Sequence, residues 1–223
     1  ALPDYGLVLS RPRALDAQRG ADGSLRIEAG TTALIVAQDP VRVTLERDGQ
    51  AVLRSITDEH FRGWTRFPAF GQDGARWTAA VALESGEPVY GLGEKFSALN
   101  RRGQLLHSQV EDALGVNTEL AYKNVPFCWS PGGWGLFVNT PGRVSHGVGY
   151  PEWSHRSYVA IVDDEALDLF LLVADSPAQM LSRYTHVTGH APTLPVWGLG
   201  LWVSKAYYAT AAEATDAAAA LRA

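Results

Sequence analysis

The residues of this chain that could do chemistry gather in one stretch, which runs from Val89 to Phe137. It combines glycines that form turns, a loop with the adjacent carboxylates Glu111 and Asp112, and an aromatic-rich segment. Carboxylates in a loop can bind and orient a polar ligand, although acids of this kind are also common as solvated turn residues. A purely structural domain would have little reason to keep these features together, so the stretch indicates a ligand.

Three other features could carry chemistry but favour structural readings. His186 and His190 have the i, i+4 spacing of a metal-chelating pair, but Gly189 lies between them, so we expect the helix to end first and expect no metal site. Gly91-Leu92-Gly93 lacks the third glycine of a dinucleotide-binding fingerprint and predicts a bend or a close backbone contact. Cys128 is interpreted as a small buried side chain.

The composition excludes several classes of function. The chain has 223 residues and a formal charge of -5, with no basic cluster that could follow a phosphate backbone, so we expect no nucleic-acid partner. No apolar run approaches the length of a membrane-spanning helix, and the first residues lack the pattern of a signal peptide. A single cysteine cannot form an internal disulfide, which favours a cytoplasmic protein.

The elements that must position the stretch from Val89 to Phe137 are predicted to be mostly strands and turns. Alternating segments at 24–29 and 41–46 lie beside dipeptides that suit tight hairpins. This spacing predicts a large antiparallel β-sandwich. The turn signals are Asp22-Gly23, Asp48-Gly49, Asp73-Gly74 and Ser130-Pro131-Gly132-Gly133.

The pattern changes near residue 175. Ser176 followed by Pro177 predicts the start of a helix that ends at Gly189. The apolar run 196–203 is typical of a strand buried on both faces, and the alanine-rich run 211–223 predicts a second helix. We therefore divide the chain into a β-sandwich domain at 1–192 and, at 193–223, the truncated start of a (β/α)₈ barrel, and expect the chain to be a fragment.

Several segments resemble glycoside hydrolase family 31, in order and with plausible spacing. The segment AYKNVPF most resembles the bacterial α-xylosidase branch of that family. The similar segments are GLGEKF at 91–96, NRRGQ at 100–104, ELAYKNVPF at 119–127, GWGLFVNTP at 133–141 and LPVWGLGLWVS at 194–204.

The resemblance implies a galactose-mutarotase-like sandwich packed on a (β/α)₈ barrel that hydrolyses α-glycosidic bonds with retention. Retention needs two carboxyl groups about 5 to 5.5 Å apart, and no cofactor. In the family both are aspartates on later barrel strands, which this chain does not contain. The implied partners are an α-glycoside or oligosaccharide substrate and the rest of the barrel in the same polypeptide, and we expect this segment to be inactive alone.

The resemblance also suggests which residues bind substrate. Asp112, with Glu111 as the alternative, matches a sandwich loop that reaches over the barrel mouth and can accept sugar hydroxyls. Lys205 and Tyr207 follow the first predicted barrel strand, where residues face the active site, and Tyr207 matches an aromatic that contacts the sugar. Trp202 is the last candidate, and its alternative role is to fill the barrel interior.

Three hypotheses about function follow. The first is the N-terminal part of a retaining α-xylosidase, with α-glucosidase as its alternative because Lys205 and Tyr207 depart from the xylosidase pattern. The second is a non-catalytic carbohydrate-binding module, with Trp129, Trp134 and Trp153 as a stacking platform. The third makes the sandwich an interface that supports a homo-oligomer.

Overall fold

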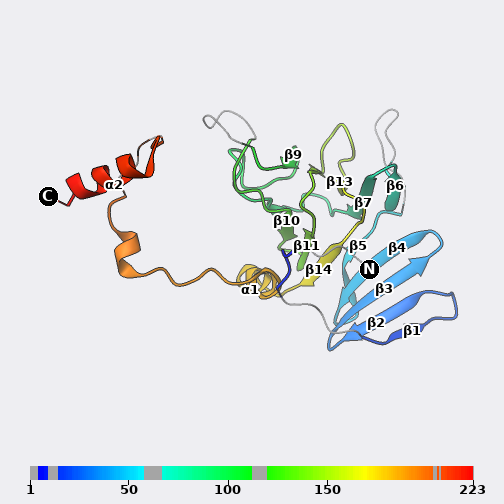
Figure 1. Ribbon diagram of the computed structural model, residues 1–223. Coiled ribbons are helices and arrows are strands. Elements are labelled where there is room, and N and C mark those ends of the chain that lie inside the picture. The colour runs from blue at the N-terminus through cyan, green and yellow to red at the C-terminus, as the bar shows by residue number, and fades with distance from the viewer. Residues whose placement is uncertain are drawn as a thin grey trace. The chain divides into compact units, whose positions relative to one another are not determined.

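The computed structural model describes residues 5–9, 15–57, 67–111, 120–202, 205 and 207–222 (Figure 1). The chain divides into two compact units, residues 1–189 and residues 190–223. Among the described residues, the first unit contains fourteen strands and helix α1 (Pro177–Thr188), and the second contains a 3₁₀ turn and helix α2 (Ala211–Ala220). No helix in the described ranges is long and apolar enough to cross a membrane.

The strands form three sheets in which every neighbouring pair is antiparallel. The first sheet has the order β1 (Ala17–Arg19), β2 (Leu25–Ala29), β3 (Thr32–Gln38), β4 (Val41–Arg47) and β5 (Gln50–Arg54). The second has the order β14 (Leu169–Val173), β11 (Trp134–Val138), β10 (Phe127–Ser130) and β8 (Tyr90–Gly91). The third has the order β6 (Phe70–Asp73), β7 (Arg76–Ala82), β13 (Ser157–Asp163), β12 (Val144–Val148) and β9 (Gln104–Ser108). The prediction of a mainly antiparallel β fold is therefore confirmed.

One apolar core joins the sheets. Side chains on a strand alternate between its two faces, so one face of strands β7 and β9–β14 in the second and third sheets supplies the core. The first sheet adds Leu45 and Leu53 to the same cluster. The core residues of the central strands are Trp134, Leu136 and Val138 on β11, Val144 and Val148 on β12, and Tyr158, Ala160 and Val162 on β13.

The predicted turns all connect paired strands. Asp22-Gly23, Asp48-Gly49 and Asp73-Gly74 lie in the β1–β2, β4–β5 and β6–β7 hairpins, and Ser130–Gly133 joins β10 to β11. At the β4–β5 turn both residues have positive φ, 50° for Asp48 and 75° for Gly49. Such dihedrals match the twist of the flanking strands, which is why this dipeptide forms the hairpin.

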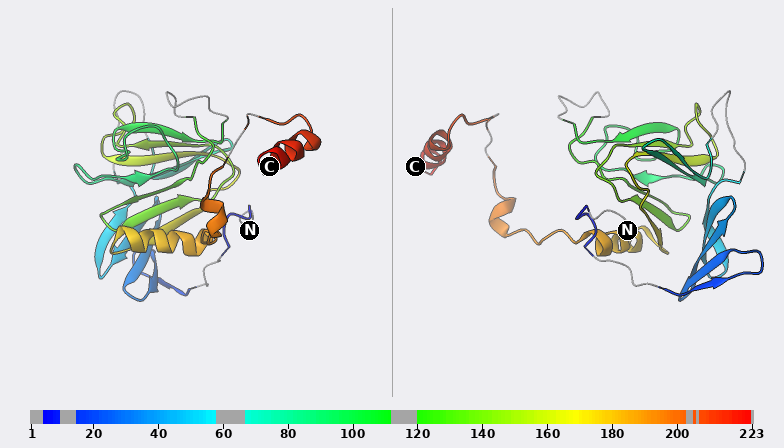
Figure 2. Two further views of the ribbon diagram at one scale, coloured as in Figure 1. Left: turned by 90° about the vertical axis from the view of Figure 1, so that its left-hand side faces the viewer. Right: turned by 45° about the vertical axis from the view of Figure 1, so that its right-hand side comes forward.

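Helix α1 begins and ends where the sequence predicts. The Ser176 hydroxyl accepts a hydrogen bond from the Gln179 N–H at 3.2 Å, and Gly189 follows the last turn. The helix packs on the outer face of the second sheet (Figure 2). There the Tyr184 ring stacks on Phe127 with centroids 4.2 Å apart. Because the helix ends at Thr188, His186 and His190 do not share a helix face, and the described residues contain no cluster of metal-ligating side chains.

In the second unit, the strand predicted at 196–203 is not observed. Residues Val196–Leu199 form a 3₁₀ turn, residues 200–202 have no regular structure, and Val203 lies outside the described residues. A buried parallel strand is held by hydrogen bonds to neighbouring strands, and no described residue of this chain pairs with the segment. The barrel unit is therefore not seen. The predicted helix is present as α2, capped by the Thr210 hydroxyl, which accepts from the Glu213 N–H at 3.2 Å.

A row of hydrogen-bonded polar side chains is buried in the apolar core. The Ser108 hydroxyl lies 2.9 Å from His146 Nε2, and His146 Nδ1 lies 2.8 Å from the Tyr158 hydroxyl. The same hydroxyl lies beside the Cys128 thiol, which is buried as predicted. Ser108, His146 and Tyr158 lie on strands β9, β12 and β13 of the third sheet, so their hydrogen bonds satisfy polar groups buried in the core and connect these neighbouring strands.

Burial sets the protonation states of His146 and Cys128. Loss of solvent lowers the pKa of His146 from 6.5 to about 3, and the nearby positive charges of Lys95 and His107 act in the same direction. Burial likewise raises the pKa of the Cys128 thiol to about 12. His146 is thus neutral in the folded domain wherever the domain is stable.

We predict that His146 makes the domain sensitive to acid. Its pKa is lower in the folded state than in the unfolded state, so the unfolded chain binds the proton first and the stability is lost as the pH falls from about 6.5 to about 3. The free energy of unfolding should fall in this window by up to about 1.4 kcal/mol per pH unit because of this group. His146→Gln should flatten the dependence, measured by urea unfolding at several pH values. His155→Gln, at an exposed position, should leave it unchanged.

The glycine turn of residues 91–95 lies directly against the segment that precedes β10. The Leu92 N–H donates to Phe127 O at 2.8 Å, and the Glu94 N–H donates to Lys123 O at 2.8 Å. Gly93 has a φ of 75°, and a Cβ atom there would overlap Lys123 O and lie 2.6 Å from Val125 N. The predicted close backbone contact is therefore confirmed.

We predict that Gly93→Ala destabilises the domain by about 3 kcal/mol, from the left-handed dihedral and the overlap with backbone together. Gly74→Ala provides a matched control, because Gly74 also has positive φ (60°) but a Cβ atom there would meet nothing within 4 Å. The control should cost about 1 kcal/mol. Thermal unfolding of the two variants gives the comparison, and equal losses would show that the close approach is unimportant.

Candidate functional site

The candidate site begins where the chain leaves β9 and returns to β10. Val110 and Ala121 form an isolated parallel bridge, and the Glu111 N–H donates to Ala121 O at 3.2 Å. The two legs of this connection, residues 109–111 and 120–121, therefore lie side by side. Glu111 is half-buried on the first leg, whereas Asp112 lies outside the described residues.

The amide of Asn124 joins both legs. Its Nδ2 donates to Gln109 O at 2.6 Å and to Ala121 O at 2.7 Å, so each amide proton holds one leg. Its Oδ1 accepts from Lys95 Nζ at 2.5 Å, and the same ammonium donates to His107 O at 2.6 Å. Lys95 reaches this position from the glycine turn.

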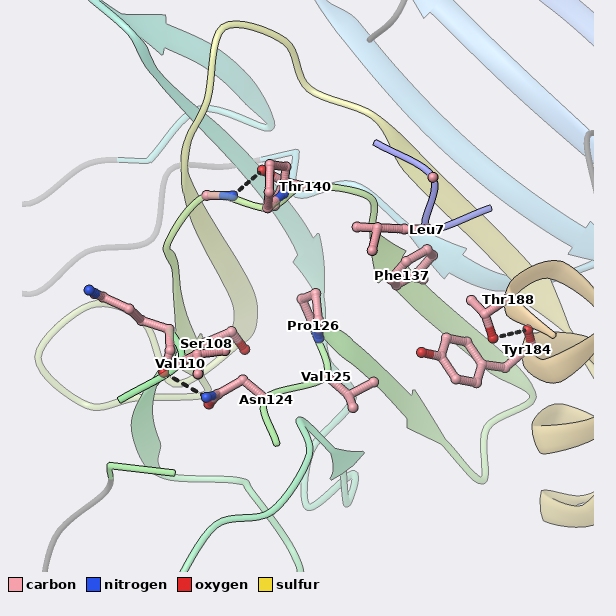
Figure 3. A pocket seen from close by; sticks show the side chains of 14 residues that line it. Leu7, Ser108, Val110, Asn124, Val125, Pro126, Phe137, Thr140, Tyr184 and Thr188 are labelled. Carbon is pink, nitrogen blue, oxygen red and sulfur yellow. Dashed lines mark hydrogen bonds between the residues drawn. The ribbon is translucent and has the colours of Figure 1, made fainter. Parts of the chain in front are cut away.

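A cavity of about 500 Å³ lies beside the legs (Figure 3). Leu7 of the N-terminal segment, Phe137 of β11 and Tyr184 of α1 line it together with Val110 and Asn124. Burial raises the pKa of Tyr184. None of the described lining residues carries a carboxylate or an imidazole, so the cavity has no acid–base pair for hydrolysis.

The legs, and Tyr122 directly after the second leg, carry large side chains in solvent. Val110 is 69% exposed, Tyr122 is 57% exposed and Leu120 is 40% exposed. Such residues next to a polar loop are typical of a surface that contacts something else, since monomers rarely keep apolar groups together in water.

The remaining predicted site residues, Lys205, Tyr207 and Trp202, lie in the second unit. The Lys205 ammonium forms an ion pair with Glu213 and lies 5.2 Å from the centroid of the Tyr208 ring. Tyr207 is 74% exposed and Trp202 is 75% exposed, and the Trp202 indole N–H donates to Gly198 O at 2.8 Å. Trp202 therefore does not fill an apolar interior in this structure.

The predicted tryptophan platform is wrong for Trp134. That side chain is 1% exposed in the core, and its indole N–H donates to Glu87 Oε1 at 2.8 Å. Trp129 and Trp153 are half-buried and come from different parts of the sandwich, where Trp129 pairs with Tyr90 and Trp153 with Phe67. The three side chains do not form one stacking surface.

Asn124 and Lys95 were not identified from the sequence as site residues. An asparagine before a strand is a common turn residue, and a lysine in a glycine turn is usually solvated. The one feature of the sequence that could have identified them is their position inside the segments GLGEK and AYKN. The structure brings these two segments into contact.

A family model, the glycosyl hydrolase 31 N-terminal galactose mutarotase-like domain, matches residues 9–146. An alpha-xylosidase of Emericella nidulans is 39% identical over 137 residues, 61% of this chain and 17% of the relative. Alpha-xylosidase XylQ of Lactiplantibacillus pentosus is 33% identical over 129 residues, 58% of this chain and 16% of the relative. Alpha-glucosidase 2 of Bacillus thermoamyloliquefaciens also matches, at 23% identity over 61% of this chain and 18% of the relative. The matched segments are thus less than a fifth of each relative's length.

A solved structure supports the same fold. The GH31 alpha-xylosidase from a soil metagenome, complexed with xylose, superposes with a TM-score of 0.71 at 22% identity. It covers 100% of this chain, which corresponds to 34% of that protein. With the family model covering well over half of the sequence, the chain belongs to glycoside hydrolase family 31 and contains the N-terminal galactose mutarotase-like domain of that family.

Proposed function

We propose that this chain is the N-terminal part of a retaining α-glycosidase that removes terminal α-linked xylose. The observation that carries the proposal is membership of family 31 together with 39% identity to the alpha-xylosidase of Emericella nidulans. In this proposal residues 1–192 form the supporting sandwich, and residues 193–223 begin the catalytic barrel.

The chemistry of retention assigns this chain a binding role. One carboxylate attacks the anomeric carbon and a carboxylic acid about 5 to 5.5 Å away protonates the leaving group. We assign that pair to later barrel strands of the same polypeptide. The sandwich would then orient the substrate, with Asp112 or Glu111 accepting sugar hydroxyls.

The second unit would add contacts at the barrel mouth. An aromatic ring suits the C–H face of a pyranose, and the exposed Tyr207 and Trp202 rings are available for such contact. The ion pair with Glu213 holds the Lys205 ammonium, which could donate to a sugar hydroxyl from that position.

An α-glucosidase is the second candidate, because residues after the apolar run depart from the xylosidase pattern. Lys205 and Ala206 stand where the xylosidase pattern has small hydroxylated residues, and Tyr207 stands where it has phenylalanine. The relatives also include an enzyme named alpha-glucosidase 2. Glucose differs from xylose by the hydroxymethyl group on C5, so the choice depends on whether the pocket blocks that group. A free-standing carbohydrate-binding module is less well supported, because Trp134 is not available as a platform.

We predict that the full-length protein hydrolyses p-nitrophenyl α-D-xyloside faster than the α-D-glucoside and that the 223-residue chain hydrolyses neither. Release of p-nitrophenolate by both proteins, side by side, measures this. A faster glucoside rate would favour the α-glucosidase. Hydrolysis by the short chain would show that the carboxyl pair has been assigned to the wrong part of the protein.

We predict that Asp112→Ala in the full-length enzyme lowers kcat/KM for the preferred glycoside by roughly ten- to a hundredfold, because the variant loses one charge-assisted hydrogen bond to a sugar hydroxyl. The folded state should be retained, as measured by thermal unfolding. Glu152→Ala is the matched control, because it removes an exposed acid from another loop of the sandwich. Unchanged kinetics on every glycoside tested would remove Asp112 from the site.

A further inference from the structure

We propose that Asn124 is a positioning residue for substrate binding, which acts by fixing the spacing of the two legs, residues 109–111 and 120–121. The proposal rests on the proposed function, taken with Glu111 as the acid that contacts the sugar. Asn124 itself does not need to touch substrate.

The first observation is that both amide protons and the carbonyl oxygen of the Asn124 side chain are hydrogen-bonded. Both Nδ2 protons go to carbonyls, Gln109 O on the first leg and Ala121 O on the second. The oxygen accepts from the Lys95 ammonium. A carboxamide has two donors and one acceptor oxygen, so this arrangement matches its chemistry.

The second observation is that the orientation of the amide is determined. Lys95 can only donate, so it must face the Asn124 oxygen, and the two carbonyls can only accept, so they must face the nitrogen. Lys95 is itself held by His107 O at 2.6 Å. The amide cannot flip without placing its NH₂ against an ammonium and its oxygen against a carbonyl.

The third observation links Asn124 to the candidate ligand Glu111. Ala121 O accepts from Asn124 Nδ2 at 2.7 Å and from the Glu111 N–H at 3.2 Å. Ala121 is only 2% exposed, and the close approach of Gly93 limits movement of the segment next to it. A shift of the second leg therefore moves the Glu111 backbone, and a displacement of about 1 Å in a binding group can change rates by up to about 100-fold.

The test compares Asn124→Asp with Asn100→Asp in the full-length enzyme. Asp at 124 keeps the acceptor for Lys95 but replaces two donors with an oxygen that faces two carbonyls. Asn100 is a matched control, because among the described residues its side chain is hydrogen-bonded only through Oδ1, which accepts from the Val89 and Arg102 N–H groups at 3.2 and 3.1 Å. Asp can make both of those bonds.

The proposal predicts that Asn124→Asp raises the KM for p-nitrophenyl α-D-xyloside by about tenfold with kcat within about twofold, because the loss is in substrate placement. Asn100→Asp should leave both constants unchanged. Asn124→Ala removes the donors without adding a repulsive oxygen and should also raise KM, which keeps the test open if the Asp variant fails to fold.

Amide hydrogen exchange on the same proteins separates this proposal from the proposed function. Exchange at the Glu111 amide should be about tenfold faster in Asn124→Asp than in the parent protein and unchanged in Asn100→Asp, because the acceptor of that amide is no longer held. Unchanged exchange, or an unchanged KM in an active enzyme, overturns the positioning role. A parent protein that hydrolyses no α-glycoside overturns the proposed function, while the exchange result still decides whether Asn124 holds the legs.

Discussion

The contact on which this end of the sandwich depends is the backbone approach of the glycine turn 91–95 to residues 123–127. Only a residue without a Cβ fits at Gly93, and the approach allows two backbone hydrogen bonds to form at 2.8 Å. It also places the Lys95 ammonium beside the Asn124 amide. The Lys95–Asn124 hydrogen bond, which orients the amide that joins the two legs, depends on that placement.

The sandwich provides the rigidity behind this contact. Three antiparallel sheets share one core, and directional hydrogen bonds link the buried side chains of Ser108, His146 and Tyr158 across neighbouring strands of the third sheet. Ser108 ends β9, immediately before the first leg. The loop base is thus attached to a strand with side chains buried in the core, which suits a segment that must present side chains accurately.

Local signals in the sequence predicted much of the fold. The Asp-Gly dipeptides at 22–23, 48–49 and 73–74 identified hairpins, and the caps at Ser176 and Thr210 identified both helices, because these features depend on neighbouring residues. The strand expected at 196–203 was wrong because apolar composition does not supply the hydrogen-bonding partner that a strand needs. The pairing of Lys95 with Asn124, 29 residues apart, is set by tertiary structure, so no local pattern revealed it.

The central claim is that the segment held by Asn124 lies in the sugar site of a family 31 enzyme. A crystal structure of the full-length protein with a bound α-xyloside would test it most directly. The account predicts a carboxylate of residues 111–112 within hydrogen-bonding distance of a sugar hydroxyl, with Asn124 still bonded to both legs. A sugar bound in the barrel with no contact to residues 109–121 would contradict it.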